Sequence, residues 1–223
     1  PDIKLIAVGE LGERDRMVLK NCSESMDLIS EHFYRQDWHG GGLMTHVKQI
    51  PDAIREKADA HRQYRQEIPQ LEGKDIRICM DEWNYWYGPH IYGELGTRYF
   101  MRDAMGIAAG LNEYSRQSDM VFMANYAQTV NVIGCIKTNT TSSVFDATGQ
   151  VLKLYRQKFG TIPVTVGGEI RPLDIAATLS ADGSKLTVSI VNPTWEEVKV
   201  PMTILNGTVT AEGELWQVTA PDD

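Results

Sequence analysis

The feature that most constrains the fold is the alternation of short apolar runs with helical patterns along the first 160 residues. The strand-like apolar runs lie at residues 3–8, 26–34, 76–82 and 121–128. Helical patterns lie at residues 51–68, 99–118 and 150–159. Strands and helices that alternate in this way are typical of parallel strands joined by crossover helices. The first 160 residues are therefore predicted to form an α/β unit.

Two of the helical patterns carry further signals. Residues 51–68 open with Pro51 and have acidic residues at positions 52 and 56, so the helix is expected to begin with Pro51 in its first turn. In residues 99–118, apolar side chains recur at steps of three and four, which predicts a helix with one buried face. These apolar side chains are Phe100, Ala104, Ile107, Ala108 and Leu111.

The pattern changes at about residue 161. Residues 186–190 alternate between apolar and polar with a period of two, and residues 181–184 supply a turn before them. The Asn-Gly pair at residues 206–207 predicts a second hairpin, between strands at 198–205 and 208–216. Because no helical pattern remains, residues 161–223 are predicted to form an all-β region.

Four strand–helix units can form either an open doubly wound sheet or half of an eight-stranded (β/α)8 barrel, which takes about 250 residues when complete. An open sheet usually has a G-x-G-x-x-G phosphate-binding turn after its first strand. Residues 9–13 read Gly-Glu-Leu-Gly-Glu and lack that turn, and the glycines at 40–42 lack the lysine of a P-loop. Residues 1–160 are therefore predicted to be half of a barrel.

Composition limits the partners. The chain has 22 lysines and arginines against 30 aspartates and glutamates, a net charge of -8, which disfavours nucleic acid and anionic membranes. No apolar run reaches about 18 residues, so no transmembrane helix is expected. The three cysteines are far apart without a C-x-x-C, and no H-E-x-x-H occurs, so neither a metal nor another cofactor is predicted. A neutral ligand such as a sugar stays open.

Barrel enzymes carry their chemistry at the carboxyl ends of the strands, and alternate residues of a strand share a face. In the third run, Ile76, Ile78, Met80 and Glu82 share one parity, so they are predicted to face the barrel lumen with Glu82 at its mouth. Glu82 is thus the leading candidate for a catalytic carboxylate, and Asp81 is a supporting residue or an outward cap. A solvated strand end beside core aromatics is the structural alternative.

The neighbouring strands add polar side chains to the same end. His32 and Tyr34 share one parity, while Glu31 takes the other and is expected to face the helices. In the fourth run, alternate residues should share one face: Phe122, Ala124, Tyr126 and Gln128. Gln128 is the last of them, so it is expected at the mouth as a hydrogen-bonding amide. Aromatic rings stack on the C–H faces of sugars, and several follow Glu82 directly: Trp83, Tyr85, Trp86 and Tyr87.

Together these residues carry a family resemblance. Residues 80–87, Met-Asp-Glu-Trp-Asn-Tyr-Trp-Tyr, resemble the strand-seven motif of family 51 glycoside hydrolases, the α-L-arabinofuranosidases. Three further segments resemble the family in order and spacing: residues 26–34 its strand six with His-x-Tyr, residues 125–133 its strand eight and following loop, and residues 173–192 its C-terminal β-sandwich. The resemblance implies that residues 1–160 are the C-terminal half of the (β/α)8 barrel, strands five to eight. It makes residues 161–223 an incomplete antiparallel β-sandwich domain.

The resemblance also implies roles for single residues. Glu82 would be the nucleophile, His32 would support catalysis, and Tyr34 would hydrogen-bond the nucleophile. Trp86 and Gln128 would bind the sugar. The implied reaction is the removal of terminal non-reducing α-L-arabinofuranosyl residues from arabinose-containing polysaccharides or oligosaccharides by retaining double displacement, in which the two carboxyl groups lie about 5–5.5 Å apart.

The sequence departs from the family at the acid/base glutamate, which follows an asparagine on strand four. The one Asn-Glu pair, at residues 112–113, lies in a predicted helix, so the acid/base is expected outside this chain. The chain also begins at Pro1 without an initiator methionine, which indicates a piece of a longer protein and leaves its compartment, cytoplasmic or secreted, unassigned. The chain alone is therefore expected to be a soluble but inactive fragment that needs the N-terminal half of the barrel.

The half-barrel is also predicted to leave unpaired strand edges, which invite pairing with another chain, so a homo-oligomer is possible.

Two alternative functions stay open. An endo-acting glycosidase, an endoglucanase or xylanase, uses the same barrel, and fold does not decide substrate. A non-catalytic carbohydrate-binding module would also place aromatic residues near strand ends. Glu31 stands where an apolar residue is usual, and the sequence does not explain it.

Overall fold

The α/β unit contains one four-stranded parallel sheet. The structure is a computed structural model, and it describes residues 3–36, 40–87, 96–168, 170–210 and 212–220. The strands follow in chain order across the sheet: β1 (Ile6–Val8), β2 (Leu28–Arg35), β3 (Arg77–Tyr85) and β4 (Val121–Tyr126). All three neighbouring pairs are parallel, as the alternation of strands and helices predicts.

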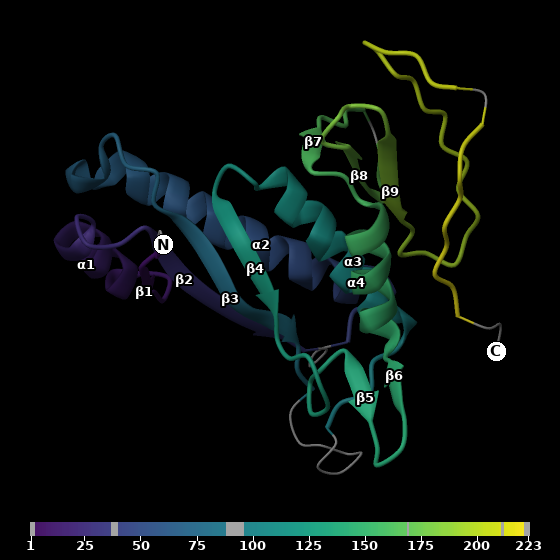
Figure 1. The fold of residues 1–223 in the computed structure, drawn as a ribbon, viewed down its shortest axis with the longest axis horizontal. Coiled ribbons are helices and arrows are strands. Elements are labelled where there is room, and N and C mark those ends of the chain that lie inside the picture. The colour runs from purple at the N-terminus through teal and green to yellow at the C-terminus, as the bar shows by residue number, and fades with distance from the viewer. Residues whose placement is uncertain (1–2, 37–39, 88–95, 169, 211, 221–223) are drawn as a thin grey trace.

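Helices connect the strands and cover one face of the sheet (Figure 1). They are α1 (Glu13–Cys22), α2 (Gly42–Glu67), the short 3-10 turn η1 (Pro69–Leu71) and α3 (Met101–Arg116). The sequence pattern did not predict α1. The prediction that a helix begins with Pro51 in its first turn is wrong, because α2 begins nine residues earlier and contains Pro51 in its interior. Val47 and Ile50 of the added turns are buried, so packing offsets the cost of an interior proline.

The main core lies between the sheet and the helices α2 and α3. Ile50 and Ile54 of α2, and Ala104 and Ile107 of α3, are fully buried there. The two helices approach closely at Gly110, where an added Cβ would lie 2.5 Å from Cγ2 of Ile50. This close packing fixes the helix layer behind the sheet, and therefore fixes the orientation of the strand ends.

The edge strands β1 and β4 leave apolar side chains exposed to solvent. Val8 of β1 is 61% exposed and Phe122 of β4 is 45% exposed. Ile6 and Met123 on the same two strands are also exposed. Each edge strand therefore presents an unpaired backbone and apolar side chains to the surroundings.

The rest of the chain is mainly antiparallel β-structure. A hairpin of β5 (Ile136–Thr138) and β6 (Ser143–Phe145), which the sequence did not predict, precedes α4 (Ala147–Lys158). A three-stranded antiparallel sheet follows: β7 (Ile162–Val164), β8 (Asp174–Leu179) and β9 (Leu186–Val191). The turn expected at residues 181–184 joins β8 to β9, and the Asp182 side chain accepts hydrogen bonds there from Ser180 and Ser184.

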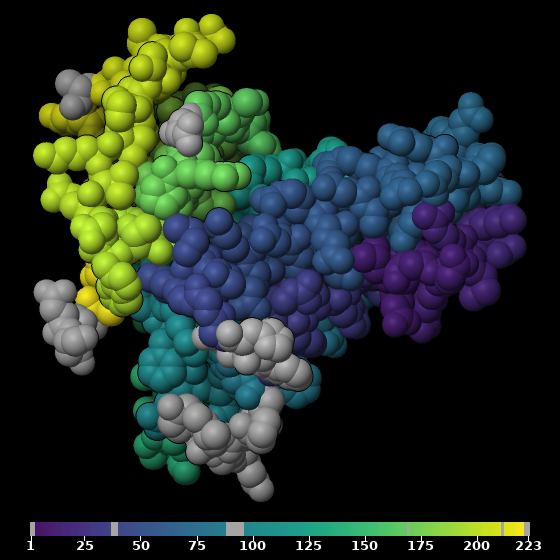
Figure 2. Space-filling model, turned by 180° about the vertical axis from the view of Figure 1, so that it is seen from behind, coloured from purple at the N-terminus to yellow at the C-terminus, as the bar shows by residue number. Residues whose placement is uncertain are grey.

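The predicted hairpin around residues 206–207 is wrong for the part of the chain that is described. Residues 192–210 and 212–220 contain no strand, and they run as an extended segment beside the three-stranded sheet (Figures 1 and 2). Trp195 and Leu215 on this segment are 90% and 89% exposed. A strand pair needs an apolar face that is covered, and these side chains have no such cover.

A polar contact joins the three-stranded sheet to the α/β unit. Asp174 at the start of β8 forms an ion pair with Arg116 of α3, at 2.9 Å, and accepts a hydrogen bond from Asn112, at 2.7 Å. The Tyr155 hydroxyl of α4 donates to the amide oxygen of Asn112 at 2.8 Å. The sheet is therefore attached on the side of α3 and α4, away from the carboxyl end of β2.

Candidate active site

Strand β3 contains one residue more than either neighbour between Met80 and Trp83. Such an extra residue is a β-bulge, and it changes which side chains share a face. It falls at Asp81 and Glu82, the two carboxylates that the sequence singles out. The pairs that show it are Glu31–Met80 and His32–Glu82 on the β2 side, and Met80–Ala124 and Trp83–Tyr126 on the β4 side.

The bulge corrects the predicted lumen face of this strand. Ile78 and Met80 do not share a face with Glu82, because both are fully buried in the core that contains α2 and α3. Trp83 and Tyr85 enter the same core after the bulge. A regular strand would have directed Glu82 to the helices with Met80, so the extra residue is the reason that Glu82 faces the other side.

Tyr34 and Glu82 are in direct contact. The Tyr34 hydroxyl donates a hydrogen bond to Oε2 of Glu82 at 2.7 Å, and His32 is the residue of β2 in register with Glu82. Burial, followed by the hydrogen bond to the Glu82 carboxylate, raises the pKa of Tyr34, so the phenol keeps its proton at neutral pH. The structure thus brings Tyr34 into contact with Glu82 and places His32 in register beside Glu82 on the neighbouring strand.

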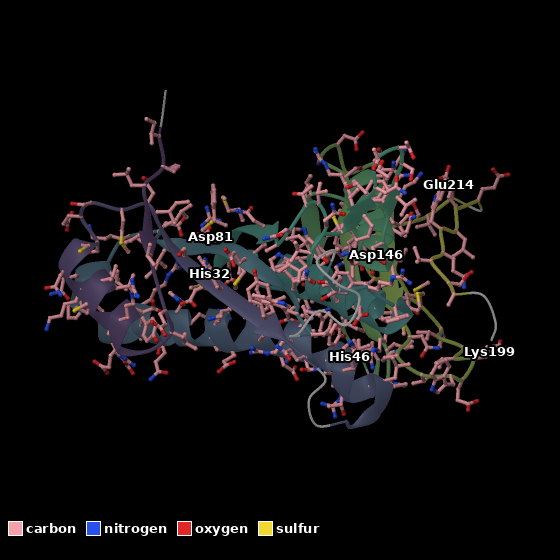
Figure 3. All side chains as sticks on the ribbon, turned by 90° about the horizontal axis from the view of Figure 1, so that it is seen from below. His32, His46, Asp81, Asp146, Lys199 and Glu214 are labelled. Atoms are coloured by element: carbon pink, nitrogen blue, oxygen red, sulfur yellow. The ribbon has the colours of Figure 1, made fainter. Side chains whose placement is uncertain are left out.

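Asp81 lies between two other groups. Its Oδ2 is 3.8 Å from Nε2 of His32, and the two side chains lie beside each other in Figure 3. The Cys79 thiol donates to Oδ1 of Asp81 at 2.5 Å. Burial, and then the neighbouring Asp81, raise the pKa of Cys79 to about 12, so this thiol is not a nucleophile at neutral pH. Asp81 therefore faces His32, as a supporting residue would, and it is not an outward cap.

The two predicted sugar-binding residues differ in their placement. Trp86 contacts Tyr34 edge-on, with ring centroids 5.2 Å apart, and its own ring is half-exposed. Gln128 is exposed, and its backbone forms hydrogen bonds with Ile133 and Cys135 in the loop after β4. Among the described residues, no contact joins the Gln128 amide group to Glu82. The structure brings Trp86 to the site and leaves Gln128 in the adjoining loop.

The predicted face of β4 also needs correction. Tyr126 does not face the mouth with Gln128, because its ring packs against Trp83 with centroids 5.7 Å apart and its hydroxyl donates to Thr148 at 2.9 Å. Strand β4 ends at Tyr126, so the alternation of a strand does not extend to Gln128. Parity is informative only where the backbone stays regular.

Asn84 is a structural residue of the site that sequence reasoning missed. It is fully buried, and its amide nitrogen donates to the Tyr99 hydroxyl and to the backbone oxygens of Ala127 and Ile133, at 2.7–2.8 Å. These bonds attach β3 to the loop after β4. The available signal was its place two residues after Glu82, inside a motif rich in side chains that form hydrogen bonds.

The unexplained Glu31 belongs to a buried ion cluster on the helix side of β2, as its parity predicts. Glu31 accepts hydrogen bonds from Lys57 and from Nε2 of His61, and the same nitrogen lies 3.3 Å from Oδ2 of Asp15. Asp15, Glu31 and His61 are close enough to hold a metal ion. However, Lys57 and a protonated His61 already balance the two carboxylates, so the arrangement is that of a buried ion-pair cluster.

A carboxylate at the carboxyl end of a parallel strand, with aromatic rings beside it, suits glycoside hydrolases, whose reaction depends on carboxylates. This is the class that the fold and the site indicate. A sequence model described as the alpha-L-arabinofuranosidase C-terminal domain matches residues 81–214, more than half of the chain. The chain therefore belongs to this family, and it corresponds to a C-terminal portion of the family 51 glycoside hydrolases.

The curated relatives are arabinofuranosidases. A probable alpha-L-arabinofuranosidase C from Aspergillus clavatus is 35% identical over 135 residues, which cover 52% of this chain and 26% of the relative. An intracellular exo-alpha-L-arabinofuranosidase from Bacteroides ovatus is 24% identical over 201 residues, which cover 82% of this chain and 37% of the relative. The chain thus spans well under half the length of these relatives.

Solved structures of the family show the same fold. An alpha-L-arabinofuranosidase from Thermotoga maritima, in complex with arabinose, has a TM-score of 0.73 at 25% identity, covering 84% of this chain and 42% of that one. The family 51 enzyme from Thermotoga petrophila has a TM-score of 0.70 at 25% identity, covering 85% and 43%. In the described part of this chain, no helix has the length and apolarity needed to cross a membrane.

Proposed function

We propose that this chain carries the nucleophile of a retaining α-L-arabinofuranosidase that removes terminal non-reducing arabinofuranosyl units from arabinose-containing polysaccharides or oligosaccharides. The observation that carries the proposal is the hydrogen bond from Tyr34 to Glu82 at the bulge of β3. This bond holds Oε2 of Glu82 on the face of the sheet away from the helices, and it leaves Oε1 free of the Tyr34 hydroxyl.

In the proposed reaction, Oε1 of Glu82 attacks the anomeric carbon and displaces the leaving oxygen, forming a covalent glycosyl-enzyme. The Tyr34 hydroxyl holds Oε2 and so fixes the direction of attack. His32, in register with Glu82 and 3.8 Å from Asp81, supports the site. A second carboxyl group, supplied from outside this chain, protonates the leaving oxygen and then activates the water that releases the sugar.

Two further residues complete the proposed sugar site. The half-exposed ring of Trp86 beside Tyr34 offers an aromatic wall for the furanose. Gln128 supplies an amide for the sugar hydroxyls from the loop after β4.

The architecture that this function requires is also part of the proposal. Residues 1–160 are the second half of the (β/α)8 barrel, with β1 to β4 as its strands five to eight, and residues 161–223 are part of the β-sandwich domain. Support comes from the parallel order of the four strands and from the solved relatives, which are more than twice as long as the matched segment. The missing partner is the N-terminal half of the barrel, which would carry the acid/base.

The test joins the chain to an N-terminal barrel half and replaces the nucleophile. Glu82→Ala is expected to abolish turnover of an aryl α-L-arabinofuranoside, because no covalent intermediate forms. Azide is expected to restore turnover and to give a glycosyl azide of inverted anomeric configuration, because it attacks from the face that Glu82 has vacated. The product configuration is measured by NMR.

Glu72→Ala is the matched control, because Glu72 is an exposed glutamate that precedes β3, whereas Glu82 lies near the carboxyl end of that strand. It should retain the parent rate with or without azide. A Glu82→Ala enzyme with the full parent rate would remove Glu82 from its role. If azide restored turnover of aryl xylosides or cellobiosides and not of arabinofuranosides, Glu82 would be the nucleophile of an endo-acting enzyme instead.

A further inference from the structure

Trp86 has no side-chain hydrogen bond within the described residues, although it stands at the centre of the proposed sugar site. Its backbone N–H donates to the carbonyl oxygen of Arg35 at 3.0 Å, and its ring touches Tyr34 only by an edge. A half-exposed indole held in this way can rotate about its side-chain bonds. Its orientation therefore depends on how firmly the neighbouring backbone is held.

Both chain neighbours of Trp86 are held by one buried group of side chains on the helix side. The Tyr85 hydroxyl donates to the backbone oxygen of His46 at 2.7 Å, and the two rings stack at 4.4 Å. The Tyr87 hydroxyl donates to Oδ1 of Asp103 and lies 3.1 Å from Nε2 of His46. The Trp86 ring itself contacts Tyr34, so it lies on the other side of the chain from this group.

The anchoring group is rigid because it ties together the starts of two helices. His46 lies near the start of α2 and Asp103 lies in the first turn of α3, and both are fully buried. Nε2 of His46 is 2.9 Å from Oδ1 of Asp103, and Oδ2 of Asp103 accepts from the backbone N–H of Phe100 at 2.7 Å. Figure 3 shows His46 apart from His32 and Asp81. The group therefore holds the strand end from behind and does not contact the proposed nucleophile.

We infer that His46 and Asp103, acting through the Tyr87 hydroxyl, are positioning residues that fix the Trp86 ring against Tyr34 and so shape the sugar-binding wall. The fixing of Trp86 is a property of this chain by itself. The consequence for sugar binding rests on the proposed function, and the two are measured separately.

The first experiment measures the orientation of Trp86 in the chain as it stands. The chain is labelled with 5-fluorotryptophan, and Trp86→Phe identifies the fluorine resonance of Trp86. Tyr87→Phe removes only the anchoring hydroxyl, so it is expected to shift or broaden this resonance and leave those of Trp195 and Trp216 unchanged. Tyr155→Phe is the matched control, because it removes another buried hydroxyl that bonds Asn112, away from the strand end.

The second experiment uses the enzyme completed with an N-terminal barrel half. Tyr87→Phe is expected to raise KM for an aryl α-L-arabinofuranoside about five- to tenfold and to keep kcat within about twofold, because the reacting groups are untouched. Asp103→Asn is expected to act in the same direction. Tyr155→Phe should alter neither constant.

The two experiments fail in different ways. An unchanged Trp86 resonance in Tyr87→Phe overturns the positioning role, whatever the enzyme hydrolyses. A fall in kcat with KM unchanged also overturns it, because the hydroxyl would then act on the reaction. If the Trp86 resonance shifts in Tyr87→Phe but the completed enzyme cleaves no arabinofuranoside, the positioning role stands and the proposed function is rejected.

Discussion

At the scale of single residues, one extra residue in β3 decides the chemistry of the strand end. Met80 and Trp83 both lie in the core, and only the bulge between them allows Asp81 and Glu82 to avoid it. Tyr34 then finds Glu82 within 2.7 Å. The sequence singled out Glu82 from an alternation that the structure does not follow, and the bulge is what still brings this carboxylate to Tyr34.

The hydrogen bond from Tyr34 gives a prediction at this scale. In the completed enzyme, Tyr34→Phe is expected to lower kcat/KM about 10- to 100-fold, because a hydrogen bond to a charged group contributes about 1.5–3 kcal/mol. The measurement is steady-state turnover of an aryl α-L-arabinofuranoside. Since the raised pKa of Tyr34 keeps the phenol protonated, the loss should be equal from pH 5 to 9. Parent-like activity would show that this bond does not hold the nucleophile.

At the scale of elements, the helices hold the strands through buried polar contacts as well as apolar packing. Glu31 is 1% exposed and interacts with Lys57 and His61 of α2, and His61 also contacts Asp15 of α1. This cluster fixes β2 one residue before His32. Because the charges belong to three different elements, the pattern of a single strand could not show why a glutamate stands among apolar positions.

The cluster predicts how stability depends on pH. Burial alone would lower the pKa of His61, but its hydrogen bonds to Asp15 and Glu31 outweigh burial and raise it. The stabilisation by protonated His61 is therefore complete below its ordinary pKa of about 6.5 and is lost as pH rises through the raised value. Burial alone would raise the pKa of Asp15, but hydrogen bonds from His61 and from the backbone N–H of Glu10 outweigh it and lower the pKa, so the contribution of Asp15 is lost only in acid.

The check is urea unfolding of the chain between pH 6 and pH 9. The parent should have a larger free energy of unfolding than His61→Gln. This difference should be greatest at pH 6 and should shrink as pH rises. Lys48→Gln, which changes an exposed side chain nearer the start of α2, is the control and should leave the slope unchanged. A difference that grows with pH would contradict a protonated His61. Lys57 and Tyr64 of α2 also face this imidazole and are retained in every variant.

At the scale of the whole molecule, the chain presents a sheet with two open edges. Val8 on β1 and Phe122 on β4 are exposed apolar side chains, and the extended segment after β9 exposes Trp195 and Leu215. Surfaces of this kind are usually covered by another part of the same protein or by a partner. The family relatives, more than twice as long as the matched segment, contain such additional chain.

Two outcomes are expected for the isolated chain. It should show no turnover of an aryl α-L-arabinofuranoside, because the proposed acid/base belongs to the N-terminal barrel half. It should also associate with itself as concentration rises, as light scattering coupled to gel filtration would show. Joining an N-terminal barrel half should produce activity and reduce association together. Parent-like rates from the isolated chain would mean that the acid has been misplaced, and a monomer at all concentrations would contradict the open edges.

The sequence by itself determined the order of strands and helices, the parallel sheet, the face shared by His32 and Tyr34 and the helix side of Glu31. These follow from side-chain periodicity, which is a local property of a regular backbone. The tertiary structure alone decided the bulge that directs Glu82, the early start of α2, the direction of Tyr126 and the absence of strands from residues 192–210 and 212–220. Each of these depends on what neighbouring elements cover, and a one-dimensional pattern contains no record of that contact.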